Sequence, residues 1–280
     1  MAEIVSILAL SHAPGVTGWL DKAPKAEQEA MLAGYAELAR RLRAARPDVI
    51  VGVANDHLLN FPMESVPDWC VGTADRWRGP AAWFKDWLNV ADYEVAGHRA
   101  LARHIVRDSA RRGFNLAFSE TLQFDDNFSV PLKLLTPGYN VPLVPIHMNC
   151  VMPPLPEPER CYAFGRCLAD AVRAWPVARR VAIMATGGLS HDPGGPKYFA
   201  VDERFDRWFL ELLAEGNPAQ VLREVTIDRM IAAGDGGTVE LLAWFVAMGA
   251  AGAGPAETVF YVPSVPLRCG MGGVTWKVAA

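Results

Sequence analysis

The chain has 280 residues, of which 51% are hydrophobic and 21% are charged, a composition that allows a large buried core. Its formal net charge of −4 gives no basic surface for binding phosphates, so we expect no nucleic-acid partner. The apolar N-terminal run is short and lacks a basic leader, so we expect a buried strand rather than a membrane span. These features favour small-molecule chemistry in a cytoplasmic protein.

Short apolar segments alternate with segments of helical periodicity along the whole chain. In chain order, strands are predicted at residues 4–10, 49–54, 141–147, 181–186 and 259–262, and helices at 27–45, 93–112, 157–175 and 205–214. This alternation predicts an α/β fold in which helices flank a central sheet that is largely parallel or mixed. No repeat, low-complexity tract or polar linker divides the sequence, so residues 1–280 are expected to form a single layered domain.

One stretch after the second predicted strand is rich in aromatic residues. Residues 62–87 carry Trp69, Trp77, Trp83 and Trp87 among prolines and glycines. The stretch is either a loop packed by its own side chains or an aromatic wall of a pocket. The sequence leaves both interpretations open.

The cysteines indicate neither a disulfide framework nor a zinc knuckle, because their number is odd and no CxxC pair occurs. We expect all five to be reduced and structural. They are Cys70, Cys150, Cys161, Cys167 and Cys269.

Three of the six histidines follow the carboxyl ends of predicted strands. His12, His57 and His191 lie in the segments SHAPG, NDHLLNF and GGLSHDPGG. Loops at that edge of an α/β sheet commonly carry ligands and catalytic groups, because the strands hold them rigidly. A single loop histidine is more often a hydrogen-bonded structural residue, but three in equivalent places predict one shared site.

The remaining histidines give weaker signals. His98 and His104 are six residues apart on one predicted helix, which places them on different faces, so we assign them to structure or solvent. His147 ends a predicted strand and its role is left open.

Competing motifs fail on inspection. GGLSHD resembles a nucleophile elbow at Ser190, but Asp192 stands where the tight turn requires glycine, which disfavours a serine hydrolase. The runs GDGGTVE and GMGGVTW break the spacing of a dinucleotide-binding loop. The sequence contains neither a Walker A lysine motif nor H-E-x-x-H.

Residues 234–250, GDGGTVELLAWFVAMGA, predict a glycine-rich turn that enters an apolar helix. Thr238 or Asp235 is the expected N-cap, and Glu240 falls in the first turn. Such a glutamate commonly does no more than complement the helix dipole. It is nevertheless a candidate acidic ligand to a metal held by the loop histidines.

Taken together, these segments resemble the class III, or LigB-type, extradiol ring-cleavage dioxygenases, and within them the catalytic β chains of the protocatechuate 4,5-cleaving type. The likeness covers most of the chain. It rests on SHAPGVTGWLDKA at 11–23, RPDVIVGVANDHLLNF at 46–61, SVPLKLLTPG at 129–138, PLPEPERCYAFG at 154–165, ATGGLSHDPGG at 185–195 and GDGGTVELLAWFVAMGA at 234–250.

The resemblance implies that the chain is one catalytic domain holding non-haem Fe(II) through His12, His57 and Glu240. It also implies O2 as co-substrate and His191 as the catalytic acid and base. Two imidazoles and one carboxylate suit Fe(II) and leave neighbouring positions open for a diol and O2.

Four further residues are implied beside the metal or the substrate. Asn55 and Asp56 match the family's N-D-H pattern and either orient the ligand ring or cap a turn. Asp126 replaces a family histidine that lies by the substrate, so the family's usual substrate cannot be assumed. Asp126 either faces the substrate or forms an Asx turn with Asn127 and Phe128.

The implied substrate is a catechol, a substituted protocatechuate or gallate, or an aminophenol, and the sequence fixes neither the substrate nor the cleavage position. A metal-dependent hydrolase on the same triad and a non-catalytic subunit that keeps the fold are the alternatives. The resemblance leaves open a small α chain or a homo-oligomer. Either such a partner or the chain's own residues 262–280, with Arg268 and Trp276, is expected to close the site.

Overall fold

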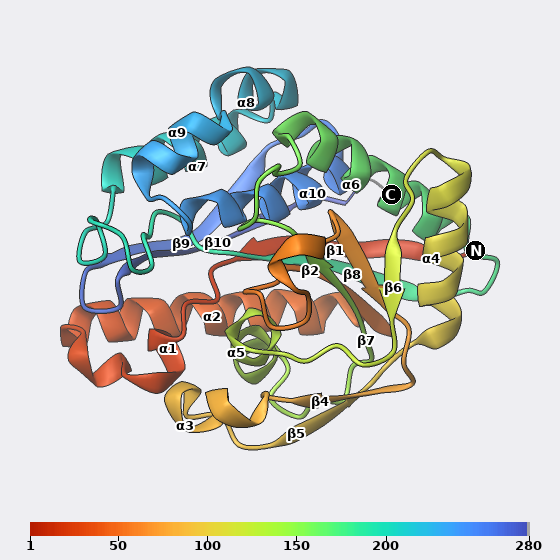
Figure 1. Cartoon of the computed structure of the whole chain (residues 1–280), viewed down its shortest axis with the longest axis horizontal. Coiled ribbons are helices and arrows are strands. Elements are labelled where there is room, and N and C mark those ends of the chain that lie inside the picture. Colours follow the sequence, from red (N-terminus) through yellow and green to blue (C-terminus); the bar gives the residue numbers. More distant parts are fainter. Residues whose placement is uncertain (279–280) are drawn as a thin grey trace.

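The computed structural model describes residues 1–278, and ten strands occur among them. Their bounds are β1 Glu3–Leu10, β2 Val49–Asn55, β3 Trp69–Gly72, β4 Arg76–Gly79, β5 Tyr93–Ala96, β6 Ala117–Ser119, β7 Leu143–Met148, β8 Arg180–Thr186, β9 Ala256–Ser264 and β10 Cys269–Trp276. Eight of these strands form one sheet in the order β6-β3-β7-β2-β8-β1-β10-β9, while β4 and β5 pair separately (Figure 1).

The sheet is mixed, as predicted. Its centre, β7-β2-β8-β1, is parallel. Towards the edges, β10 pairs antiparallel with β1 and with β9, and β3 pairs antiparallel with β7. Parallel central strands leave their carboxyl ends at the same edge, which is where such sheets usually bind ligands.

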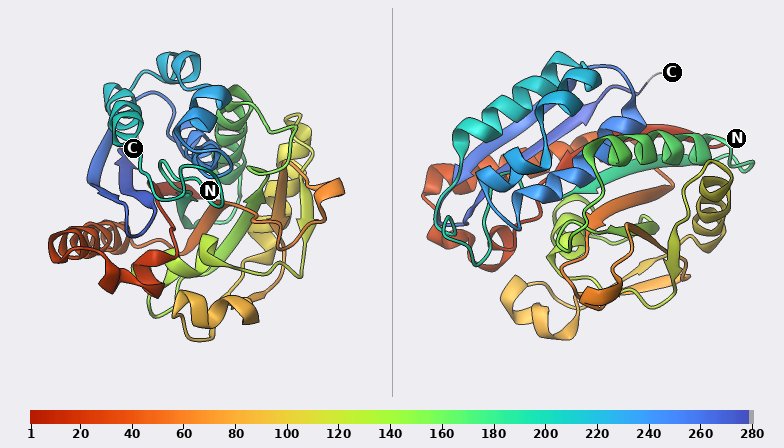
Figure 2. Two further views of the ribbon diagram at one scale, coloured as in Figure 1. Left: turned by 60° about the vertical axis from the view of Figure 1, so that its left-hand side comes forward. Right: turned by 45° about the horizontal axis from the view of Figure 1, so that its top comes forward.

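Helices cover both faces of the sheet (Figures 1 and 2). Their bounds are α1 Gly15–Gly18, α2 Lys25–Ala45, α3 Lys85–Leu88, α4 Arg99–Arg111, α5 Asp126–Leu135, α6 Pro158–Arg173, α7 Glu203–Glu215, α8 Pro218–Glu224, α9 Ile227–Ala233 and α10 Leu242–Ala251. Within residues 1–278, none of these helices combines the length and apolar character needed to cross a membrane.

Alternate residues of β1 pack into different layers, because successive side chains of a strand point to opposite faces. Ile7 and Ala9 join the cluster that contains the buried side of α10 and α6. Leu8 and Leu10 join the cluster that contains the buried side of α2 and α5. Burial on both faces explains why the central strands read as continuous apolar runs.

The five predicted strands are present, but the helix predicted at 93–112 is wrong at its start. Tyr93 and Val95 are buried while Glu94 and Ala96 are exposed, the period-two pattern of a strand. The helix α4 begins only at Arg99, because the His98 side chain caps it by accepting a hydrogen bond from the Leu101 amide. Both His98 and His104, which bonds the Ala171 carbonyl, therefore have structural contacts.

The aromatic stretch at 62–87 divides between the two interpretations. Trp69 stacks on Phe164 with ring centroids 4.5 Å apart, and the Trp77 indole donates to the Leu143 carbonyl, so both belong to the core. Trp87, in contrast, is 48% exposed and lines a cavity. The stretch supplies core and pocket wall together.

Candidate metal centre

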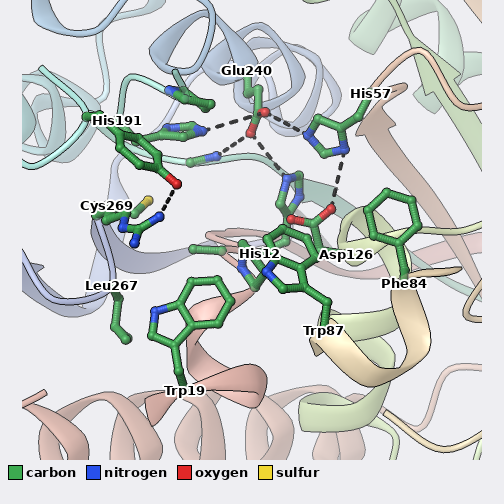
Figure 3. Close-up of a pocket in the computed structure, with 16 residues that line it drawn as sticks. His12, Trp19, His57, Phe84, Trp87, Asp126, His191, Glu240, Leu267 and Cys269 are labelled. Atoms are coloured by element: carbon green, nitrogen blue, oxygen red, sulfur yellow. Dashed lines mark hydrogen bonds and ion pairs between the residues drawn. The ribbon is translucent and has the colours of Figure 1, made fainter. Parts of the chain in front are cut away.

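The candidate site forms at the carboxyl edge of β1, β8 and β2, which are adjacent and parallel. His12 follows β1, His57 follows β2 and His191 follows β8. Figure 3 shows the three imidazoles gathered around the carboxylate of Glu240. Because neighbouring parallel strands end together, these residues meet although the chain separates them widely.

Glu240 is at the centre of this cluster. Its Oε2 atom lies 3.2 Å from His12 Nε2, its Oε1 atom lies 2.9 Å from His57 Nε2, and Oε1 is 3.7 Å from His191 Nε2. One ligand atom from each of His12, His57 and Glu240 falls within a group no wider than 4.8 Å. The group contains nitrogen and oxygen donors and no thiolate, which suits iron and other borderline divalent metals.

The tautomer of His12 follows from its second ring nitrogen. Nδ1 lies 3.0 Å from the Thr186 hydroxyl oxygen, and that hydroxyl donates its own hydrogen to the Asn127 carbonyl at 2.8 Å. The hydroxyl must therefore accept from Nδ1–H. In the neutral ring this leaves the Nε2 lone pair directed at Glu240.

His57 is oriented in the same way by a carboxylate. Its Nδ1 atom is 3.1 Å from Asp125 Oδ2 and 3.4 Å from Asp126 Oδ1, so Nδ1–H donates and Nε2 is the ring nitrogen that faces Glu240. When both rings are neutral, two imidazole lone pairs point at a buried carboxylate, and a metal cation between them removes the repulsion. The donor set therefore fits a bound metal ion.

The charges around the cluster shift the pKa values of His57 and Glu240 in opposite directions, and each shift favours the charged form. Burial lowers the pKa of His57, but the charges of Asp125 and Asp126 outweigh it and raise this pKa well above its ordinary value. Burial raises the pKa of Glu240, yet the charges of His12 and His191 hold it well below the usual range. The carboxylate is thus kept ionised, the form that binds a metal, whereas His57 must release a proton when a metal binds.

One backbone amide and one side-chain amide fix the Glu240 carboxylate. The Gly188 amide donates to Oε2 at 2.9 Å, and the Asn55 side chain donates to Oε1 at 3.4 Å. Glu240 lies in a 3₁₀ turn, Thr238–Leu241, which precedes α10. The predicted N-cap at Thr238 or Asp235 is wrong: Gly237 precedes the turn, and the Thr238 hydroxyl instead bonds the backbone of His191.

His191 lines the cavity and directs its Nε2 atom towards Glu240. Its Nδ1 atom donates to the Leu189 carbonyl at 2.8 Å, so Nε2 is free to accept a proton. Burial lowers its pKa, but the charge of Glu240 and the bond to Leu189 raise it overall. A Cβ atom on Gly188 would lie 2.3 Å from the His191 ring, which explains the glycine before this turn.

The cluster of His12, His57, His191 and Glu240 opens into a cavity of about 260 Å³. Its walls are mostly aromatic and aliphatic, with a few polar groups. Besides His12, His57, His191 and Glu240, the larger side chains that line it are Trp19, Phe84, Trp87, Asp126, Tyr198, Leu267 and Arg268. A small apolar cavity with a few convergent polar groups suits one aromatic ring.

Asp126 faces this cavity, whereas its neighbour Asp125 forms the turn. The amide of Asn127 donates to Asp125 Oδ1 at 2.9 Å, and Asp125 thereby caps α5. Burial raises the pKa of Asp126 to about 6, and the charge of Asp125 adds to the rise. The Asx turn anticipated for Asp126 is thus made by the preceding residue.

Two further polar candidates, Asn127 and Asp56, lie outside the cavity. Asn127 donates to the Asn55 carbonyl at 2.8 Å. Asp56 accepts from the amide and side chain of Asn60 and pairs with His147 at 3.1 Å. Asp56 therefore caps a turn, and His147 is its buried partner.

Two residues that orient the histidines were missed from the sequence, Asp125 and Thr186. An aspartate before an apolar run is a helix-start signal and could have identified Asp125 as a cap, although not as a partner of His57. Nothing in the sequence marks Thr186, the last residue of β8.

Of the two C-terminal residues that were expected to close the site, only Arg268 lies beside it. Arg268 lines the cavity, but Trp276 lies at the opposite end of β10, where it pairs with Ile7. The strand β10 begins at the cavity and runs away from it, so Trp276 cannot close the site. Residues 279–280 of the predicted closing segment lie outside the described residues.

Ser190 is excluded as a nucleophile by its contacts. Its hydroxyl donates to Asp206 at 2.8 Å and accepts from the Asp202 amide. Within residues 1–278 no histidine bonds this hydroxyl, so the base that a serine nucleophile requires is missing.

Fold and site define an α/β protein with a two-histidine, one-carboxylate cluster beneath a small cavity. A solved structure of an uncharacterized protein from Escherichia coli K12 has the same fold, with a TM-score of 0.58 and 16% identity over 98% of this chain and 100% of that one. At this identity the likeness concerns the fold alone.

Residues 6–264 match the family described as the catalytic LigB subunit of aromatic ring-opening dioxygenase. The chain belongs to the LigB family. It is 32% identical, over 82% of its length and 69% of the relative, to a 2,3-dihydroxyphenylpropionate/2,3-dihydroxicinnamic acid 1,2-dioxygenase of Rhodococcus sp. It is 31% identical to the gallate dioxygenase of Pseudomonas putida over 61% of this chain, and spans only 51% of that relative.

Proposed function

We propose that this chain is a non-haem Fe(II)-dependent extradiol dioxygenase that opens the ring of a catechol-type or aminophenol-type compound with both atoms of O2. One observation carries the proposal. The Nε2 atoms of His12 and His57 converge on the Glu240 carboxylate at the floor of a ring-sized cavity. Family membership supports the aromatic ring-opening reaction over metal-dependent hydrolysis.

In this proposal His12, His57 and Glu240 are the iron ligands. When bound, Fe(II) supplies a site that chelates the two adjacent ring oxygens and passes electrons from the ring to O2. Thr186 and Asp125 hold the ligand rings in the correct tautomer, and the Gly188 amide and Asn55 hold the carboxylate.

His191 moves the protons. The residue lines the cavity, and Nε2 is the ring nitrogen that can exchange a proton, because Nδ1–H is committed to the Leu189 carbonyl. It accepts a proton from a substrate hydroxyl as the diol binds, and returns that proton to oxygen when the ring opens. A positioned imidazole can serve both steps near neutral pH.

The walls exclude water and hold the ring. The cavity is lined by Trp87, Phe84 and Trp19. The ring centroids of Trp19 and Trp87 lie 5.5 Å apart. We propose that residues 1–280 act as one catalytic domain, and that a small α chain or a second copy of the chain covers the opening. Both partners remain predictions.

The proposal is tested by loading the protein anaerobically with Fe(II) and screening diols and aminophenols for O2 uptake. We expect O2 uptake with at least one diol, together with a new near-ultraviolet or yellow product. Metal-dependent cleavage of an ester without O2 uptake would instead support the hydrolase. Iron binding without turnover of any diol would support a non-catalytic subunit.

A further inference from the structure

Arg268 is the single arginine or lysine among the described residues that line the cavity. It follows Leu267 and precedes Cys269, and Figure 3 shows both neighbours across the cavity from Phe84 and Trp87. The other charged groups on the lining, apart from the histidines, are the carboxylates Asp126 and Glu240. The cavity therefore has acidic groups beside the metal cluster and one cation on a separate wall.

The Arg268 guanidinium has no carboxylate partner within residues 1–278. Its side chain makes one hydrogen bond, from Nη1 to the Tyr198 hydroxyl, and the guanidinium lies 4.3 Å and 5.0 Å from the ring centres of Tyr198 and Phe199. A guanidinium carries five N–H donors. The other donors make no hydrogen bond to residues 1–278, whereas Arg41, on the outer surface, has two glutamate partners.

The backbone of Arg268 adopts an unfavourable conformation at the wall of the cavity. Arg268 has a φ of 62°, the left-handed conformation that non-glycine residues rarely adopt. Its amide donates to the Val265 carbonyl to close the turn between β9 and β10, and the following Gly270 amide donates to the Ser190 carbonyl. Such strain at a cavity wall is often associated with a positioned functional group.

We propose that Arg268 determines specificity by binding an anionic substituent of the aromatic ring, a carboxylate in particular. The planar guanidinium can bind a carboxylate through two parallel hydrogen bonds. The same carboxylate beside Asp126 or Glu240 would meet like charge. An acid therefore enters with its carboxylate at Arg268 and its adjacent hydroxyls at the metal cluster. This inference rests on the proposed function for the identity of the ring.

The test compares Arg268→Gln with the wild type, both loaded with Fe(II) and kept anaerobic. Calorimetry measures the Kd of 3,4-dihydroxybenzoate, of benzoate and of catechol. We expect the variant to bind both acids about 10- to 100-fold more weakly, the scale of a charge-assisted hydrogen bond, and to bind catechol as before. Arg223→Gln, which removes a surface arginine paired with Glu224, is the matched control and should change none of the three.

Arg268→Lys provides a second variant if Arg268→Gln does not fold. It keeps the charge and loses the planar fork, so we expect a smaller weakening for both acids. Unchanged Kd values for the acids in either folded variant would overturn the inference, as would an equal loss for catechol.

The two proposals fail separately. If the wild type consumes no O2 with any diol, the dioxygenase proposal fails, while an Arg268-dependent Kd for benzoate still supports the anion site. If the wild type turns over catechols but Arg268→Gln binds the acids normally, the anion site fails and the dioxygenase proposal stands.

Discussion

The floor and the rim of the cavity are built differently. The floor, which we define as His12, His57, His191 and Glu240, is held at the ends of buried strands by the Thr186 hydroxyl, the Gly188 amide and the Leu189 carbonyl. The rim, which we define as Trp19, Trp87, Tyr198 and Arg268, comes from short helices, loops and a strained turn, and its members are half-buried or exposed.

The difference indicates where each property is set. A metal and a proton donor need fixed geometry, which the ends of parallel strands provide. Recognition of ring substituents depends on loops, which vary without disturbing the sheet. Changes in the floor should therefore abolish iron binding or chemistry, whereas changes in the rim should alter substrate preference.

The largest effect is expected from removing a floor ligand. His12→Ala, His57→Ala or Glu240→Ala should lose most of the bound iron, because each removes one of three protein ligands. Metal analysis after anaerobic reconstitution measures this. His98→Asn, which can keep the cap of α4, is the histidine control and should retain iron. Full iron occupancy at native affinity in any alanine variant would remove that residue from the triad.

The next effect separates chemistry from binding within the floor. His191→Ala should keep iron and still bind catechol, but lose roughly 10²- to 10⁴-fold in kcat, the usual contribution of a general acid and base. Anaerobic spectra of the catechol complex check binding, and O2 uptake checks turnover. An unchanged kcat would contradict the role of His191.

A smaller effect is expected from the residue that orients His57. Asp125→Asn keeps a capping oxygen for α5 but removes the charge facing His57 Nδ1. Iron affinity should fall about 10- to 100-fold, as when an outer hydrogen-bond partner of a metal ligand is lost. Asp21→Asn, which removes an exposed carboxylate paired with Lys22, is the matched control and should keep the iron affinity of the wild type. Equal iron affinities in both variants would assign Asp125 to capping alone.

The smallest effect is expected on the preference between two substrates. Asp126→His replaces an acceptor carboxylate with a ring that can donate, so kcat/KM should shift towards 3,4-dihydroxybenzoate relative to catechol by about tenfold. Steady-state kinetics on both substrates measures the shift. Equal effects on the two would mean that Asp126 does not contact the substrate.

The sequence predicted the floor better than the rim for a physical reason. His12, His57 and His191 each follow an apolar strand, and strands of this kind are visible as runs such as Val49–Asn55. Their convergence then follows from parallel pairing. The assignment of Glu240 depended on the family resemblance, because its position in a helix start has an ordinary explanation.

Elements whose sequences lack a clear hydrophobic periodicity were not predicted. The strand β10 contains three glycines, Gly270, Gly272 and Gly273, which weaken the strand signal. The helix α5 contains Pro131, which normally argues against a helix interior. Tyr198 and Arg268 meet through a contact between two distant loops, and no local pattern predicts such contacts.

The most direct test of the central claim is the product formed by the Fe(II)-loaded protein from a diol under O2. We predict a ring-opened product whose mass equals the substrate plus both oxygen atoms, with one O2 consumed per diol and no hydrogen peroxide released. A quinone with hydrogen peroxide, or a product formed without O2 uptake, would contradict the account.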